Sequence, residues 1–162
     1  MLFIKKIAID HEKLFSSLNT NNMTKLNYYL NFQGNAEEAF HFYQSALGGE
    51  LLGLMHFKDV PEFPGKEKLS NGDLDKVMHV ALKIGDNMLM ATDMLETLGQ
   101  HLKPGNNSTL SLHPDNKDEA DKLYHAISEG GKRHVPMTDM FWGYWGMLTD
   151  KFGVQWMVNI QN

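Results

Sequence analysis

Few residues of this 162-residue chain have the type and spacing that catalysis requires, and His79 is the first of them. An imidazole on a strand can exchange protons near neutral pH, so His79 is a candidate general acid or base. It can equally be a hydrogen-bonded structural residue of a half-buried strand, and the sequence leaves both interpretations open. The chain has no cysteine, no HExxH-like pair of histidines and no serine or threonine in a nucleophile elbow. The pattern therefore predicts neither a cofactor nor an assembled catalytic centre.

Strand alternation assigns a further set of residues to one polar surface. Along 26–32, 77–84, 107–112 and 154–160, apolar side chains alternate with more polar ones. If the polar faces converge, they line a pocket for a small molecule; otherwise they are solvent-exposed sheet. The aromatic run at 141–145 either stacks on a flat ligand as a lid, or seals one end of the fold or a dimer seam. The predicted pocket residues are Asn27, Tyr29, His79, Thr109, Ser111, Trp142, Trp145 and Met157.

The composition describes an ordinary globular chain with 42% hydrophobic and 22% charged residues. A formal charge of −5 without a basic stripe argues against a nucleic-acid partner. No apolar run reaches the roughly 20 residues that span a bilayer, and lysines interrupt the N-terminal MLFIKK before a signal core could form. We therefore expect a cytoplasmic protein with no membrane partner. The eleven methionines are interpreted as core filler rather than as an adaptable pocket.

An internal repeat indicates which elements position these residues. The segment NFQGNAEEAFHFYQSALGGE recurs weakly as SLHPDNKDEADKLYHAISEGGK, shifted by 81 residues from Asn35 to Asn116. Both asparagines are predicted helix N-caps, and Tyr43 and Tyr124 fall at matching places on the apolar stripe of each helix. Three strand-like segments follow each helix, at about 50–57, 76–84 and 87–93 and at about 132–138, 143–149 and 154–160. Each half of the chain is therefore predicted to fold as β-α-β-β-β.

Two such modules in tandem resemble the vicinal-oxygen-chelate (glyoxalase/bleomycin-resistance/dioxygenase) superfamily. The segments FQGNAEEAFHFYQSALGGE, DKVMHVALKIGDNMLMATD and MFWGYWGMLTDKFGVQWMVN are similar to its PhnB-like branch, over about residues 25–160. The resemblance implies an α+β fold whose sheets form an incomplete curved barrel with a pocket on the concave side, and it implies a homodimer. We predict a peripheral N-terminal extension or leader at 1–22 and one domain at 23–162, with modules at about 25–100 and 105–162.

Metalloenzymes of the superfamily bind a divalent ion through His and Glu side chains on four strands. The resemblance places these positions at Asn27, Leu89, Asn107 and Met157, none of which is a histidine or a carboxylate. A register shift of two would bring in Asp93, which alone would not hold an ion and is better interpreted as a turn or cap residue. The sequence therefore predicts no metal site.

The function predicted from the sequence is metal-independent binding of an unidentified small molecule. The alternative is an isomerase, lyase or dioxygenase of the superfamily with a drifted or cryptic divalent-metal site. Some members of the branch carry a ubiquinone-pathway methyltransferase label. No glycine-rich turn between a strand and a helix is present to hold a nucleotide cofactor, so that activity is not predicted.

Overall fold

The computed structural model describes residues 26–161, and its elements follow the order that the repeat predicts. The predicted extension at 1–22 lies outside the described residues. The first module contains β1 (Tyr28–Phe32), α2 (Ala36–Leu47), β2 (Glu50–His56), β3 (Val77–Ile84) and β4 (Asn87–Asp93). The second contains β5 (Leu110–Leu112), α4 (Lys117–Ile127), β6 (Lys132–Met140), β7 (Gly143–Thr149) and β8 (Gln155–Gln161).

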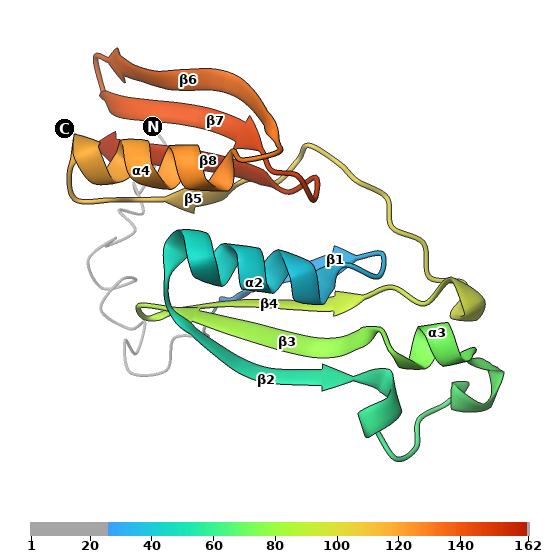
Figure 1. Ribbon diagram of the computed structural model, residues 1–162. Coiled ribbons are helices and arrows are strands. Elements are labelled where there is room, and N and C mark those ends of the chain that lie inside the picture. Colours follow the sequence, from blue (N-terminus) through green and yellow to red (C-terminus); the bar gives the residue numbers. More distant parts are fainter. Residues whose placement is uncertain (1–25, 162) are drawn as a thin grey trace, which may run out of the picture.

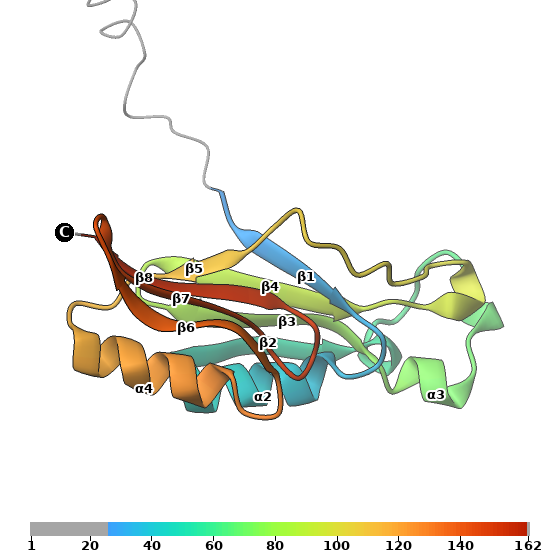
Figure 2. The same ribbon diagram turned by 90° about the horizontal axis from the view of Figure 1, so that it is seen from above.

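Each module forms its own four-stranded sheet, and the two sheets have the same topology. Their strand orders are β1-β4-β3-β2 and β5-β8-β7-β6, with the first strand parallel to the last and the other pairs antiparallel. Helices α2 and α4 lie on the same side of the sheets, and the eight described strands do not close into a barrel (Figures 1 and 2). The predicted α+β fold with two tandem modules is confirmed. None of the helices within 26–161 has the length and hydrophobicity of a membrane span.

The core lies between the helices and the sheets. The predicted apolar stripes supply Ala39 and Tyr43 from α2 and Tyr124 and Ile127 from α4, all essentially buried. These side chains meet the helix-facing rows of the strands, including the buried Trp156 of β8. Burying one large apolar side chain contributes about 1.5–3 kcal/mol, so the repeated stripe supplies the main driving force for folding each module.

The two helices begin differently. Asn116 Oδ1 accepts a hydrogen bond from the Glu119 amide (2.9 Å), as predicted for an N-cap. Asn35 occupies the N-cap position of α2, as predicted, but its side chain makes no cap bond. Asp93 Oδ1 accepts instead from the amides of Gly34 (2.7 Å) and Ala36 (3.1 Å). The first turn of α2 is therefore capped by Asp93 at the end of β4, whereas that of α4 is capped by its own Asn116.

A buried carboxylate also joins the two modules. Asp150 Oδ2 accepts from the Tyr43 hydroxyl (2.6 Å) and from Trp156 Nε1 (2.8 Å). Its Oδ1 accepts from the amides of Phe152 and Val154, both at 2.9 Å. Burial, together with the charge of Asp150, holds the pKa of Tyr43 well above its ordinary value. The hydroxyl therefore remains a donor, and it links α2 to the β7–β8 turn.

The connection between the second and third strands is long in one module and short in the other. Between β2 and β3 the chain forms two short 3₁₀ turns (Phe57–Asp59 and Lys66–Lys68) and the four-residue α3 (Asn71–Leu74). Phe57 is buried there, with its ring centroid 5.7 Å from that of Phe63. Between β6 and β7 only Phe141 and Trp142 intervene, and Phe141 is 91% exposed.

Candidate functional site

The surface that matters for function is the side of both sheets turned away from α2 and α4, which we call the open face (Figure 2). Its residues alternate with helix-facing core positions such as Val80, Leu82 and Ala91. Strand pairing places Tyr29 opposite Met90 and Ser111 opposite Met157 on this side. The open face carries Tyr29, Asn31, His79, Met88, Met90, Ser111, Trp145, Met147, Met157 and Asn159.

Methionine is the residue type that distinguishes the open face from the core. No described methionine is among the buried core residues, and Met137 is the one that packs against the core cluster from a partly buried position. Met88 and Met90 lie on the open face of the first module, and Met147 and Met157 lie on that of the second. The interpretation of the methionines as core filler is therefore wrong. A flexible, polarisable thioether surface of this kind adapts to apolar ligands.

The structure brings the predicted pocket residues together in three small groups rather than one. The ring centroids of Tyr29 and His79 lie 6.0 Å apart in the first module. In the second, Ser111 is the β-sheet partner of Met157. At the β6–β7 hairpin, the ring centroids of Trp142 and Trp145 are separated by 6.2 Å. The remaining two predicted residues, Asn27 and Thr109, precede β1 and β5.

His79 is half-buried, and its aromatic neighbour is Tyr29. An acid–base imidazole is usually oriented by a carboxylate or a similar partner. The described histidines that pair with carboxylates are His41 and His56, which lie near Glu37 on α2. The surroundings of His79 thus favour a packing role over proton transfer.

The positions aligned with a metal site do not fit a metal ion. Leu89 is 5% exposed and belongs to the helix-facing core, so the open-face neighbours in β4 are Met88 and Met90. Asp93 is buried at the α2 start, where Oδ2 also accepts from the Val77 amide (2.9 Å), which agrees with its interpretation as a cap. Within 26–161 no cluster of three potential His, Cys, Asp or Glu ligands occurs. Thioether, hydroxyl and amide groups remain, and these are poor ligands for divalent ions.

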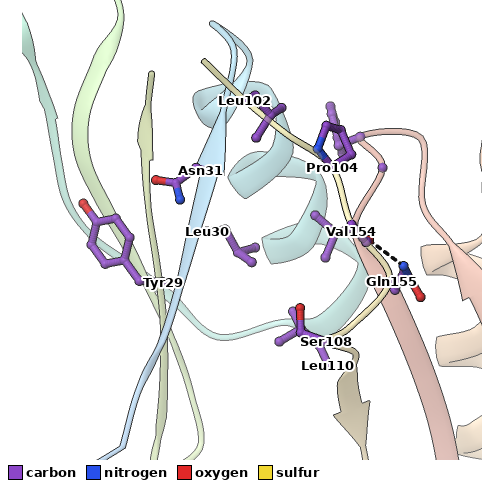
Figure 3. Close-up of a pocket in the computed structure, with 12 residues that line it drawn as sticks. Tyr29, Leu30, Asn31, Leu102, Pro104, Ser108, Leu110, Val154 and Gln155 are labelled. Carbon is purple, nitrogen blue, oxygen red and sulfur yellow. Dashed lines mark hydrogen bonds between the residues drawn. The ribbon is translucent and has the colours of Figure 1, made fainter. Parts of the chain in front are cut away.

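Two cavities lie along the seam between the modules. The first, of about 230 Å³, lies between β1, the loop at 102–105 and the start of β8 (Figure 3). Leu30, Tyr29 and Asn31 of β1 all line this cavity, with Leu30 on the side of β1 that faces Val154 and with Tyr29 and Asn31 on the opposite side (Figure 3). Gln155 Nε2 donates to Gly105 O (2.8 Å) and so holds the connecting loop over this cavity. A second cavity of about 290 Å³ is lined by residues that include Tyr28, Met88, Ser111, His113 and Trp156.

Asn159 is one of five open-face residues that the predicted pocket left out; the others are Asn31, Met88, Met90 and Met147. Alternation placed Asn159 on the polar side of β8, but only the structure shows that it is 7% exposed and lies opposite Trp145. Trp145 Nε1 and Asn159 Oδ1 are buried and have no hydrogen-bond partner in the described part of the chain. Whether a buried polar atom has a hydrogen-bond partner depends on the tertiary structure, and no sequence pattern indicates it.

Solved structures with this arrangement define the class of protein. A protein described as a glyoxalase/bleomycin resistance protein/dioxygenase family enzyme, from Burkholderia phytofirmans PsJN, is 17% identical with a TM-score of 0.57, covering 83% of this chain and 97% of its own. The PhnB protein of Bacillus cereus, a putative 3-demethylubiquinone-9 3-methyltransferase, is 23% identical with a TM-score of 0.67, covering 85% and 99%. The fold is that of the glyoxalase/bleomycin-resistance/dioxygenase superfamily.

The sequence comparisons are more specific. Residues 24–159 match the family described as 3-demethylubiquinone-9 3-methyltransferase, and the chain belongs to this PhnB-like family. Protein YjdN of Escherichia coli (strain K12) is 30% identical over 141 residues, covering 83% of this chain and 94% of that protein. The crystal structure of protein PA1353 from Pseudomonas aeruginosa is 37% identical with a TM-score of 0.76, covering 86% and 98%.

The family description names a methyl transfer, which needs a bound methyl donor. Nucleoside cofactors bind through the free amides at a glycine-rich turn and helix N-terminus. In this chain the amides of Gly34 and Ala36 at the start of α2 are taken by Asp93, and the start of α4 is capped by Asn116. The residues at both helix starts therefore do not fit a nucleoside cofactor.

Proposed function

We propose that this protein binds a small, largely apolar organic molecule on the open face, without a metal ion. The observation that carries the proposal is the methionine and aromatic lining of a sheet surface that no described helix covers. An exposed sheet face normally carries polar side chains, whereas apolar lining with a few polar groups is typical of ligand sites. Tyr29, Met90, Trp145 and Met157 provide such a lining, and Ser111 adds a polar group.

Metal independence is part of the proposal, and the donor set supports it. The central open-face pairs are Tyr29 with Met90 and Ser111 with Met157, which offer no imidazole or carboxylate. Elemental analysis after incubation with manganese, nickel, iron and zinc tests this point. A stoichiometric metal that survives dialysis would contradict it and would favour the superfamily's metalloenzyme chemistry instead.

We further propose that the protein is a homodimer. The support is the set of large apolar side chains left exposed on one chain, including Tyr29 (48%), Met55 (40%) and Trp142 (41%). A second copy that faces this surface would shield them and enclose the ligand. Light scattering on the full chain should give twice the monomer mass, and a monomer at micromolar concentration would contradict this part of the proposal.

The binding proposal is tested with the fluorescent probe 8-anilinonaphthalene-1-sulfonate, which joins an apolar aromatic body to a sulfonate. Met90→Glu and Met157→Glu each place a negative charge in the lining, and each should weaken probe binding about tenfold or more. Ser45→Glu adds the same charge at an exposed position of α2 and should leave binding unchanged. Probe affinity that is unaffected by both methionine substitutions would refute binding on the open face.

A further inference from the structure

The larger of the two seam cavities continues from the open face towards the core. Its lining combines the open-face residues Met88 and Ser111 with the core residues Leu89 and Trp156. Leu89 is 5% exposed and Trp156 2%, whereas Met88 and Ser111 are half-buried and His113, also in the lining, is exposed. The cavity of about 290 Å³ therefore has an apolar inner end and a mouth at the end of β5.

A hydrogen-bonded polar pair lies at this mouth. Ser111 Oγ lies 2.9 Å from His113 Nε2, and these two atoms share one hydrogen bond. If the imidazole nitrogen carries the proton, the serine hydroxyl is free to donate to a ligand; if it does not, the serine oxygen is free to accept from one. A ligand hydroxyl, which both donates and accepts, matches the pair in either state.

The remaining lining determines the charge and the size of the ligand. None of the described residues around this cavity is Asp, Glu, Lys or Arg. A carboxylate or an ammonium group would lose hydration there without a fixed opposite charge, so a neutral ligand is favoured. A cavity of about 150 Å³ holds benzene, so this one has room for an aliphatic chain of about eight carbons. The flexible or branched aliphatic side chains that would contact such a chain are Ile84, Met88, Leu89, Leu110 and Leu112.

We propose that this cavity binds a neutral aliphatic alcohol of medium chain length, with its hydroxyl hydrogen-bonded to Ser111 and its chain directed towards Trp156. This inference rests on the proposed function, because it names the ligand class for the part of the open face at Met88 and Ser111. His113 contacts Ser111 rather than the ligand, so it is a positioning residue that orients the serine hydroxyl. An ether has no hydroxyl proton to donate, and the site therefore prefers an alcohol to an ether of the same length.

The test compares 1-octanol with 1-methoxyheptane, an ether with the same number of non-hydrogen atoms, by isothermal titration calorimetry of the full chain. Because the two probes partition differently out of water, the measured quantity is the alcohol-to-ether ratio of affinities in each variant. Ser111→Ala should lower this ratio about threefold to tenfold, the usual effect of one hydrogen bond. Ser108→Ala makes the same substitution in the lining of the other seam cavity and should leave the ratio unchanged. A ratio that Ser111→Ala does not change overturns the inference.

The positioning role of His113 has its own test. His113→Ala should weaken 1-octanol binding and leave 1-methoxyheptane binding unchanged, and His113→Gln, whose amide also offers a donor and an acceptor, should restore part of the loss. Equal weakening of both probes would mean that His113 only packs against the ligand, and the assigned role would be wrong.

Methionine methyl signals locate the bound alcohol. Met88 lines the cavity, whereas Met147 lies on the open face of the second module outside this lining. With ¹³C-methyl methionine, the Met88 signal, assigned from Met88→Leu, should shift when 1-octanol is added. The Met147 signal, assigned from Met147→Leu, should stay in place. A shift at Met147 without one at Met88 would put the alcohol elsewhere and overturn the inference.

A charged probe tests the neutral character of the site. Octanoate should bind less tightly than 1-octanol at pH 8, where imidazoles are ordinarily neutral. Tighter binding of octanoate would mean that the cavity takes an anion, and the inference would be wrong.

Failure of this inference is distinguishable from failure of the proposed function. If 1-octanol does not bind, while 8-anilinonaphthalene-1-sulfonate binds and is weakened by Met90→Glu and Met157→Glu, the inference is overturned and open-face binding stands. If neither 1-octanol nor 8-anilinonaphthalene-1-sulfonate binds, the inference and the proposed function are overturned together.

Discussion

In the first module the start of α2 is held by Asp93, a carboxylate from the far end of β4, whereas the start of α4 in the second module is held by its own Asn116. The tyrosines at matching positions of the two helices differ in the same way, since one contacts the other module and one contacts its own. Tyr43 donates to Asp150 in the other module, and Tyr124 donates to Val135 O in its own (2.9 Å). The repeat thus preserves the apolar stripe and the strand order, while the polar contacts of the first module depend on residues distant in sequence.

The largest expected effect comes from removing the distant cap. Asp93→Ala removes the acceptor of three amides, of which those of Ala36 and Val77 are buried and that of Gly34 is partly buried. We expect a loss of about 3–5 kcal/mol in the free energy of unfolding, measured by urea denaturation. Asp86→Ala, in the exposed β3–β4 turn, serves as the control and should change it by less than about 0.5 kcal/mol. Equal losses for the two variants would mean that Asp93 is not the cap of the first module.

The tyrosines give the next largest difference. Tyr43→Phe removes a donor to a buried carboxylate and should cost about 2 kcal/mol, because hydrogen bonds to charged groups are the stronger kind. Tyr124→Phe removes a donor to a neutral carbonyl and should cost about 1 kcal/mol. Urea denaturation of both variants measures the two losses in the free energy of unfolding. A larger loss for Tyr124→Phe would contradict the interpretation that the bond from Tyr43 to Asp150, between the modules, is the stronger of the two.

The two asparagines provide a smaller but sharper contrast. Asn116→Ala should cost about 1 kcal/mol, the usual value for a lost side-chain N-cap. Asn35→Ala should cost only a few tenths of that amount, because the Asn35 side chain makes no cap bond. Thermal denaturation followed by circular dichroism resolves the difference. Similar losses at the two positions would show that Asn35 caps α2 after all.

This contrast also shows where sequence reasoning succeeds. The 3.6-residue stripe and the two-residue alternation predicted the strands after each helix to within about two residues, because burial of apolar surface dominates their formation. The predicted strand at 107–112 was too long, since the structure has only Leu110–Leu112 as strand. The chain before it forms the loop that Gln155 holds through Gly105.

The candidate site was predicted less completely than the fold. Alternation predicted Tyr29, Ser111 and Met157 on the polar sides of their strands, and the structure places all three on the open face. Trp145 was predicted from the aromatic run at 141–145, and Leu89 was placed one residue out of register with the open face. Asn159 looked like one polar strand residue among several, since unpaired burial depends on what packs around the side chain. The acceptor role of Asp93 was predicted from its position at a strand end, but its three amide partners come from elements that only the tertiary structure brings together.

The β2–β3 and β6–β7 connections also differ between the modules. We expect this difference to affect the pH dependence of stability, and this is the smallest of the expected effects. Within the long β2–β3 connection, Asp73 accepts from Lys76 Nζ (2.8 Å), Thr97 Oγ1 (2.7 Å) and Ser70 Oγ (2.8 Å). These hydrogen bonds, that from Lys76 first, hold the pKa of Asp73 below its ordinary value. The second module has only the Phe141–Trp142 turn at the matching place and no such carboxylate within its connection.

A carboxyl group whose pKa is lower in the folded state than in the unfolded state stabilises the protein above the unfolded value of about 4, and this contribution is lost as the pH falls below it. Stability of the parent should therefore decrease between about pH 5 and pH 3, and Asp73→Asn should make this decrease shallower. Thr97→Val removes one of these donors and should give an intermediate slope. The urea concentration at the midpoint of unfolding, measured at several pH values for each variant, gives this slope. If Asp73→Asn has the same acid slope as the parent, the long connection contributes nothing to acid sensitivity, and the difference between the modules is confined to their helix caps and tyrosines.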